Sequence, residues 1–192
     1  MKQLPLLLLS LFLLAACQQN RFNIKGTTEG LSSGDTLFLV RDINTGFPSD
    51  TMIVREGIFS YTGIADSAIL GILYAQKDPE IATTLFIEPG TIEIHLADSI
   101  QKTRVSGTDA NEALQEANYL AYRYGEKMKE VALALSTNPL DSMLVSMVEA
   151  QLSSLKKDLT KRIKEIAARN ADNAFGQLID NSLEEEEKEI AD

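Results

Sequence analysis

The fold class follows from the segment LFIEPGTIEIHL, which spans residues 85–96. Apolar side chains occupy alternate positions on both sides of its centre, which is the pattern of β-strands that bury one face. At the centre, Pro89 presets φ for the first inner position of a turn and Gly90 suits the second. The segment therefore predicts two strands joined by a type II turn, with their apolar faces packed together.

Short alternating runs of the same kind recur from Phe22 to about Ser106, separated by Gly, Pro and Asp. Arg55-Glu56-Gly57 lies between two of them and predicts a second tight hairpin, because Gly57 can take the positive φ that such turns need. Seven or eight short strands at this spacing predict an antiparallel β-sandwich or open barrel over residues 22–107. The other predicted strands lie at residues 22–26, 36–40, 68–74 and 102–106.

The period of the apolar pattern changes from two residues to that of a helix at Gly107. Two apolar stripes follow, separated by Asn138-Pro139, and each predicts a helix of roughly 27 residues and about 40 Å. The short connection between them predicts a long antiparallel α-helical hairpin over residues 108–170, so the fold class is α+β. The stripes comprise Leu114, Ala117, Ala121, Tyr124, Met128, Val131 and Leu135, then Leu144, Val148, Leu152, Leu155, Leu159, Ile163 and Ile166.

Residues 171–192 predict an acidic C-terminal tail or a short helix. The stretch 170–176 interrupts the helical pattern, and Ser182-Leu183-Glu184-Glu185 has the spacing of a capping box, so a helix is expected to begin at Ser182. The acidic run 184–187 is typical of a solvated helix end.

The N-terminus predicts an export signal over residues 1–16. Its apolar core is too short to cross a bilayer, and small residues follow it at the expected cleavage site. The string Leu14-Ala15-Ala16-Cys17 resembles the lipobox of bacterial lipoproteins, which implies that Cys17 is lipidated and becomes the first mature residue. Several acyl chains would anchor the protein stably, with residues 17–21 as a tether. By analogy with such lipoproteins, Gln18 favours the outer membrane of the cell envelope.

Composition narrows the chemistry that the chain can perform. A net charge of −10 repels phosphate, so no nucleic-acid partner is expected. One Cys and one His exclude a CxxC redox centre and a site of several histidines. We therefore expect no cofactor, no metal and no enzymatic activity. His95 is expected to face away from the apolar side of its strand without catalytic partners, and a hydrolase using two of the many carboxylates is the exception left open.

Tyr119 and Tyr122 lie off the main stripe of the first predicted helix. Partly exposed tyrosine is favoured at protein interfaces, although packing of the helices would also use it. These two residues are thus candidates for an interface.

Three segments resemble a domain of unknown function that precedes TlpA-like thioredoxin domains in Bacteroidetes envelope lipoproteins. They are the opening FNIKG at residues 22–26, the segment DTMIVREGIFSYTG at residues 50–63 and LFIEPG at residues 85–90. The resemblance covers about residues 22–107 and, more loosely, the helices. The chain lacks the WCxxC-type motif of the thioredoxin domain, so it is expected to be either a stand-alone accessory domain or a truncated form.

These features predict a membrane-anchored cell-envelope lipoprotein that acts as a non-enzymatic binding or scaffolding module. Its expected partners are the membrane, through the lipid on Cys17, and a protein or a second copy, through the helical hairpin. The alternative, which rests on the resemblance, is an accessory partner of a separate thioredoxin-like protein in thiol-disulfide exchange.

Overall fold

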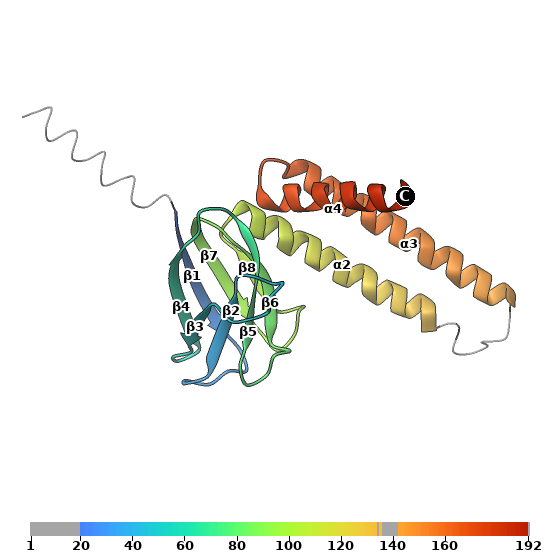
Figure 1. The fold of residues 1–192 in the computed structure, drawn as a ribbon. Coiled ribbons are helices and arrows are strands. Elements are labelled where there is room, and N and C mark those ends of the chain that lie inside the picture. Colours follow the sequence, from blue (N-terminus) through green and yellow to red (C-terminus); the bar gives the residue numbers. More distant parts are fainter. Residues whose placement is uncertain (1–19, 134, 136–141, 192) are drawn as a thin grey trace, which may run out of the picture. The chain divides into compact units, whose positions relative to one another are not determined.

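The protein has an α+β fold in which eight strands in two open sheets precede the helices, as the sequence predicted (Figure 1). The structure, a computed structural model, describes residues 20–133, 135 and 142–191, with the backbone alone for residues 184–191. The chain divides into two compact units between Asn111 and Glu112. The strands lie in the first unit, which we call the β-domain, and we call the second the helical unit.

Two four-stranded sheets make up the β-domain, with strand orders β4-β1-β7-β8 and β3-β2-β5-β6. We call them sheet A and sheet B. The strands are β1 (Arg21–Thr28), β2 (Thr36–Val40), β3 (Asp50–Ile53), β4 (Ile58–Ile64), β5 (Ile69–Ala75), β6 (Ala82–Ile87), β7 (Gly90–Leu96) and β8 (Arg104–Ser106).

The strands pair antiparallel, as predicted, with one exception: β1 and β7 are parallel. In this pair Lys25 lies beside Glu93 and Thr27 beside His95. Parallel neighbours cannot be joined by a tight turn, and here most of the β-domain sequence separates them. Local pattern therefore gave no sign of this pairing.

The core lies between the two sheets. Alternate residues of each strand are buried there, for example Phe22 and Ile24 on β1 and Ile92, Ile94 and Leu96 on β7. The opposite positions of sheet A point to solvent and are mostly polar, with Ile58 and Ile64 on β4 as exposed apolar exceptions.

The predicted hairpin at residues 85–96 is wrong. The strands β6 and β7 flank Pro89, but β6 pairs with β5 in sheet B, and β7 pairs with β1 and β8 in sheet A. Gly90 has φ of 132°, and the chain passes there from one sheet to the other. The apolar faces do meet, as expected, but across the core of a sandwich and not within one sheet. Periodicity identifies the buried face of a strand and does not identify its neighbour.

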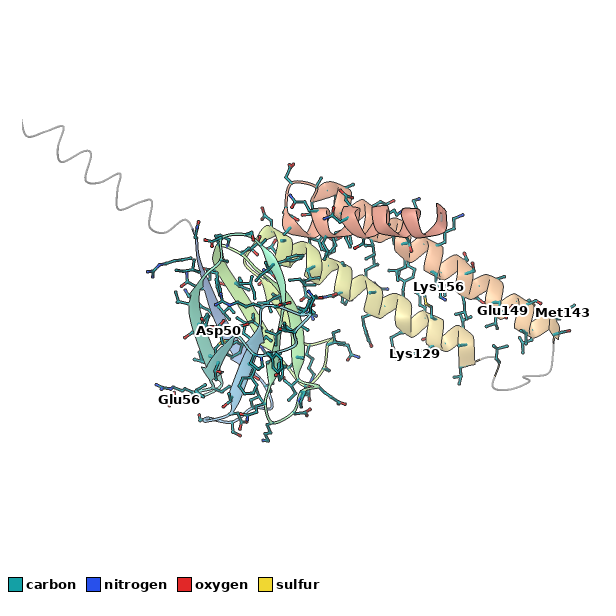
Figure 2. The ribbon with its side chains drawn as sticks, in the orientation of Figure 1. Asp50, Glu56, Lys129, Met143, Glu149 and Lys156 are labelled. Atoms are coloured by element: carbon teal, nitrogen blue, oxygen red, sulfur yellow. The ribbon has the colours of Figure 1, made fainter. Side chains whose placement is uncertain are left out.

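The turn at residues 55–57 is confirmed locally, although its strands diverge. Arg55 and Ile58 exchange two backbone hydrogen bonds of 2.8 and 2.9 Å around Glu56 and Gly57, whose φ values of 53° and 75° fit a type I′ turn. Beyond the turn, β3 joins sheet B and β4 joins sheet A. Figure 2 shows Glu56 at the tip of this connection.

The helices are α2 (Asp109–Leu133), α3 (Ser142–Arg169) and α4 (Ala174–Ala191). Tyr124 and Glu116 on α2 contact Asp158 and Arg169 on α3, an order that makes the two helices antiparallel. Burial along the predicted stripes is partial, since Ala121 is exposed and Met128 is half-buried. None of the helices in the described residues is apolar over a length sufficient to cross a membrane.

The last helix begins earlier than the sequence predicted. Asn173 caps it by accepting hydrogen bonds from the backbone N–H groups of Phe175 at 3.0 Å and Gly176 at 3.3 Å. Ser182 lies inside α4 and donates to the carbonyl of Leu178 at 2.8 Å, so it is not the cap. Asn is as good an N-cap as Ser. The prediction relied on the capping-box spacing at Ser182 and therefore placed the start of the helix too late.

Candidate functional site

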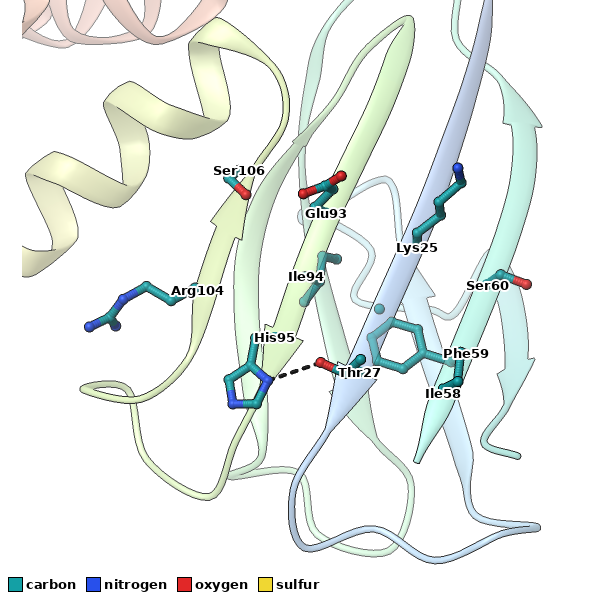
Figure 3. Close-up of a pocket in the computed structure, with 11 residues that line it drawn as sticks. Lys25, Thr27, Ile58, Phe59, Ser60, Glu93, Ile94, His95, Arg104 and Ser106 are labelled. Atoms are coloured by element: carbon teal, nitrogen blue, oxygen red, sulfur yellow. Dashed lines mark hydrogen bonds between the residues drawn. The ribbon is translucent and has the colours of Figure 1, made fainter. Parts of the chain in front are cut away.

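The outer face of sheet A carries a groove lined by charged and hydroxyl side chains as well as apolar ones. Two rows of side chains cross its four strands in register: Ser60, Lys25, Glu93 and Ser106 form one row, and Ile58, Thr27, His95 and Arg104 form the other. Residues opposite one another on neighbouring strands have Cβ atoms about 5 Å apart. Figure 3 shows these side chains standing on the strands that line the groove.

The groove is shallow and has a volume of about 470 Å³. Its floor includes Gly26, which faces the core against the buried ring of Phe59. A Cβ at Gly26 would lie 2.0 Å from Cζ of Phe59, so only glycine leaves room for that ring. The close approach keeps β1 and β4 together beneath the polar rows.

His95 has a partner on the neighbouring strand. Its Nδ1 lies 3.0 Å from Oγ1 of Thr27 in a hydrogen bond, drawn dashed in Figure 3. Its Nε2 lies 3.7 Å from Oε1 of Glu29, beyond hydrogen-bond length. The hydroxyl, imidazole and carboxylate follow the order of a catalytic triad, but the carboxylate is exposed and does not orient the ring as that mechanism requires.

The charges of the groove are open to an incoming ligand. Within the described residues, no carboxylate lies within ion-pair distance of Lys25. Arg104 donates to the carbonyl oxygens of Gln101 at 2.5 Å and Thr103 at 2.8 Å. Two cations, Glu93 and several hydroxyl groups therefore face solvent together, an arrangement suited to a polar surface of mixed charge.

A second polar cluster joins the two sheets. Arg41, after β2, donates from Nε to Asp50 at 2.6 Å and from Nη2 to the hydroxyl of Tyr61 on β4 at 3.1 Å. The Tyr61 hydroxyl donates to the same carboxylate, and the guanidinium lies 5.0 Å from the centre of the Phe22 ring. Burial and the Asp50 carboxylate raise the pKa of Tyr61 above its ordinary value of 10.0. Every charge here has a partner, so this cluster is structural.

The candidate residues named from sequence fall elsewhere. Tyr119 and Tyr122 lie on α2 in the helical unit, where Tyr119 is exposed with Arg123 6.0 Å from its ring centre, and Tyr122 is half-buried. Leu14, Ala15, Ala16 and Cys17 lie outside the described residues. Neither the interface role of the tyrosines nor the lipidation of Cys17 is tested by the structure.

Sequence reasoning predicted the outward orientation of His95 but gave it no partner, and it did not single out Lys25, Thr27, Glu93 or Arg104. The sequence did indicate that these side chains point outward, because each lies on the solvent-facing side of a two-residue alternation. That signal marks outward residues on every strand. Only the parallel register of β1 and β7 brings this set together.

The two open sheets and the transition to helices define the class: a β-sandwich domain followed by a helical unit. Within it, residues 22–114 match the model of a family described as a domain of unknown function, DUF4369. The match covers the β-domain and the start of α2. It confirms the predicted domain of unknown function for this part of the chain.

Comparison with solved structures finds similarity to the crystal structure of a "putative cell adhesion protein" from Bacteroides ovatus. The TM-score is 0.27 and the identity 10%, with 47% of this chain and 44% of that chain covered. The chain thus spans less than half the length of that protein, and a likeness this remote supports no functional argument. No curated protein matches the chain.

Proposed function

We propose that this protein is a cell-envelope lipoprotein, anchored through the lipidated Cys17, whose β-domain is a non-enzymatic binding module. The observation that carries the binding role is the pair of registered polar rows on sheet A, with Lys25, Glu93 and Arg104 open to solvent. The anchor rests on the lipobox-like sequence at residues 14–17. The outer membrane is the expected location.

The groove favours a protein surface as its ligand. It is shallow and lined by both signs of charge, whereas sites for small molecules are deep and enclose most of the ligand. An acidic side chain of the partner would pair with Lys25 or Arg104, and a basic one with Glu93. The net charge of −10 disfavours nucleic acid.

Membrane fractionation tests the anchor. Cells that produce the full chain are extracted at high salt and high pH, which release proteins held by charge alone. The natural chain should stay with the membranes, Cys17→Ser should lose this attachment, and Gln18→Ser should keep it. Equal retention of the Cys17→Ser chain would contradict the lipid anchor.

A charge-reversal pair tests the groove. The anchored protein is captured from its own envelope and the co-purifying proteins are identified by mass spectrometry. Lys25→Glu should reduce recovery of the specific partner at least about tenfold. Lys77→Glu, a reversal at an exposed lysine between β5 and β6 whose Nζ lies 3.8 Å from Asp35, should leave recovery unchanged. Equal recovery by both variants would remove the groove from the binding surface.

The same capture distinguishes the alternative. A thioredoxin-like protein recovered with the natural chain and lost with Lys25→Glu would identify the module as an accessory partner in thiol-disulfide exchange. Recovery that depends on Tyr119 and Tyr122, but not on Lys25, would place binding on the helical hairpin.

A further inference from the structure

The proposed lipid anchor lies close to one particular end of the β-domain. Only residues 18 and 19 separate Cys17 from Asn20, which directly precedes β1. A fully extended chain spans at most about 3.6 Å per residue, so Asn20 lies within roughly 11 Å of the lipidated residue. We call the end of the β-domain at which β1 begins the tether end, and the opposite end the far end. An anchor at Cys17 holds the tether end next to the membrane surface.

The end of β4 and the loop between β2 and β3, residues 41–49, lie at the tether end. The carbonyl of Asn20 accepts a hydrogen bond from the N–H of Ala65 at 2.9 Å, directly after β4. The carbonyl of Ile64, the last residue of β4, accepts from Nη1 of Arg41 at 3.1 Å. These bonds connect the 41–49 loop, through β4, to the residue that follows the anchor.

The 41–49 loop is closed at its base by hydrogen bonds. Ser49 N–H donates to the carbonyl of Leu39 at 2.8 Å, and Oγ of Ser49 accepts from the N–H of Arg41 at 3.3 Å. Inside the loop, the carbonyl of Asp42 accepts from the N–H of Gly46 at 3.2 Å. The loop therefore has a defined turn, which is fixed to the ends of two strands of sheet B.

Three large apolar side chains are exposed in these segments. Phe47 and Ile43 in the loop are 75% and 46% exposed, and Ile64 at the end of β4 is 62% exposed. Ile43 lies two residues after Arg41, and Phe47 two residues before Ser49, so both are close to the base of the loop. Single exposed apolar residues are ordinary, but a group of them beside a membrane anchor indicates a surface that contacts lipid.

Charge does not account for an attraction between the tether end and lipid. The segments 20–21, 41–50 and 64–69 carry two cations and three carboxylates, namely Arg21, Arg41, Asp42, Asp50 and Asp66. Arg41 already forms an ion pair of 2.6 Å with Asp50. Anionic headgroups would also repel a chain of net charge −10. Contact with lipid therefore depends on burial of the apolar side chains.

On the basis of the proposed anchor, we infer that Phe47, Ile43 and Ile64 insert into the interface of the bilayer that holds the lipid on Cys17. Aromatic and aliphatic side chains of interfacial segments lie roughly 5–10 Å into the boundary between headgroups and acyl chains. The anchor makes this contact intramolecular, so a few apolar side chains suffice to maintain it. The lipid attaches the chain, and these three residues determine which surface of the β-domain meets the bilayer.

This contact leaves the candidate groove accessible. β1 runs from the tether end toward the far end, and Lys25 and Thr27 lie five and seven residues beyond Asn20. At about 3.3 Å per residue, these two groove residues are roughly 16 and 23 Å along the strand from Asn20. The groove is thus separated from the inserted residues and open to another protein of the envelope.

Tryptophan fluorescence tests the contact, because the chain has no Trp of its own. Phe47→Trp and the control Ile100→Trp are produced as full lipidated chains and reconstituted into phosphatidylcholine vesicles. Ile100 is 62% exposed and lies between β7 and β8, at the far end. Flotation with the vesicles measures the anchor separately, and circular dichroism checks that both variants are folded.

The Phe47→Trp chain should emit at shorter wavelength than the control. Lipids with brominated acyl chains should quench it at least about threefold more strongly, because its ring reaches the acyl boundary. Both effects should persist at high salt, since the contact is apolar. Equal quenching of two chains that float, or a wavelength shift without quenching, would overturn the inference and leave the anchor intact. Failure of both chains to float would reject the anchor, and the inference with it.

A matched pair of second substitutions tests the neighbouring residue. Ile43 and Ile53 are both 46% exposed, but Ile53 lies at the end of β3 and therefore at the far end. In the Phe47→Trp chain, adding Ile43→Asp should reduce quenching by brominated lipid at least about twofold, because a carboxylate resists insertion. Adding Ile53→Asp should leave the quenching unchanged. Equal quenching in the two double variants would exclude Ile43 from the inserted surface and so contradict the inference.

Discussion

At the scale of residues, the side chains of Arg41 and Asn111 connect separate elements of the β-domain through hydrogen bonds. Arg41 links Asp50 at the start of β3 to Tyr61 on β4 and so bridges the sheets. Asn111, fully buried, bonds through its side-chain oxygen and nitrogen to the backbone of Phe86 at 2.8 and 2.9 Å. It completes the edge of β6 in place of another strand. Buried polar groups of this kind stabilise only while every partner is present.

We expect Asn111→Ala to destabilise the β-domain by about 1–3 kcal/mol, because it leaves the backbone N–H and C=O of Phe86 buried without partners. Urea unfolding of the full chain measures the change. Thr108→Val removes only the 2.8 Å bond between Asn111 and Thr108 and should cost less. A cost for Asn111→Ala no larger than that of Thr108→Val would contradict this account.

Tyr61 makes stability depend on pH in the alkaline range. Its pKa is raised in the folded state, first by burial and then by Asp50, so the unfolded chain loses the proton at a lower pH than the folded one. The stabilisation is complete below pH 10 and declines as pH rises toward the raised pKa. Tyr61→Phe should cost about 1–3 kcal/mol at pH 7, and this cost should shrink above pH 10. Tyr74→Phe is the control, and unfolding curves at pH 7 to 11 provide the measurement.

At the scale of elements, the connection between β3 and β4 combines a tight turn with a change of sheet. Type I′ turns require positive φ at both inner positions, which Gly57 tolerates and Glu56 does not favour. Glu56 is nevertheless held there, with its N–H donating to Oγ of Ser33 at 2.8 Å. The backbone strain at Glu56 can therefore be relieved by a residue that tolerates positive φ.

Glu56→Asn should stabilise the β-domain by about 0.5–1 kcal/mol, because Asn-Gly is the preferred pair for this turn. Glu56→Ala removes the same charge without relieving the backbone and should not stabilise. Thermal unfolding of the two variants distinguishes backbone strain from charge. Equal stabilisation by both would identify the carboxylate, and not φ, as the cause.

At the scale of the whole molecule, the two units have different kinds of interior. The β-domain has a continuous core of fully buried side chains between its sheets. The helical unit has few buried residues on α3, namely Val148, Ile166 and Ala167, and uses polar contacts between helices. The Tyr124 hydroxyl donates to Asp158, which also accepts from Arg162 at 3.2 Å. The helical unit should therefore respond more strongly to changes in charge.

The hydrogen bonds from Tyr124 and Arg162 hold the pKa of Asp158 below its ordinary value of 3.8. The resulting stabilisation is present above that value and is lost as pH falls through the lowered pKa. Asp158→Asn should thus lower the melting temperature of the helices at pH 7, and the difference should vanish in acid. Ellipticity at 222 nm reports on the helices, and Asp172→Asn, an exposed position, is the control. A difference that persists unchanged in acid would exclude this titration.

The sequence by itself determined the buried face of most strands, that seven or eight short strands precede the helices, and where the period changes. Those features follow from local periodicity and from the turn residues, which act within a few positions. Glu56-Gly57 shows how far such information extends, because it specifies the turn but not the sheets that the two strands join.

Only the tertiary structure decided the neighbours of each strand. The 85–96 segment looks like a hairpin because both of its strands bury alternate residues, and that burial is the same whether they lie side by side or face each other across a core. The groove could not be predicted for the same reason. Its residues on β1, Lys25 and Thr27, are distant in sequence from Glu93 and His95 on β7, and they meet only because β1 and β7 pair in parallel. Pairing between distant strands depends on the packing of the entire core, which no local pattern contains.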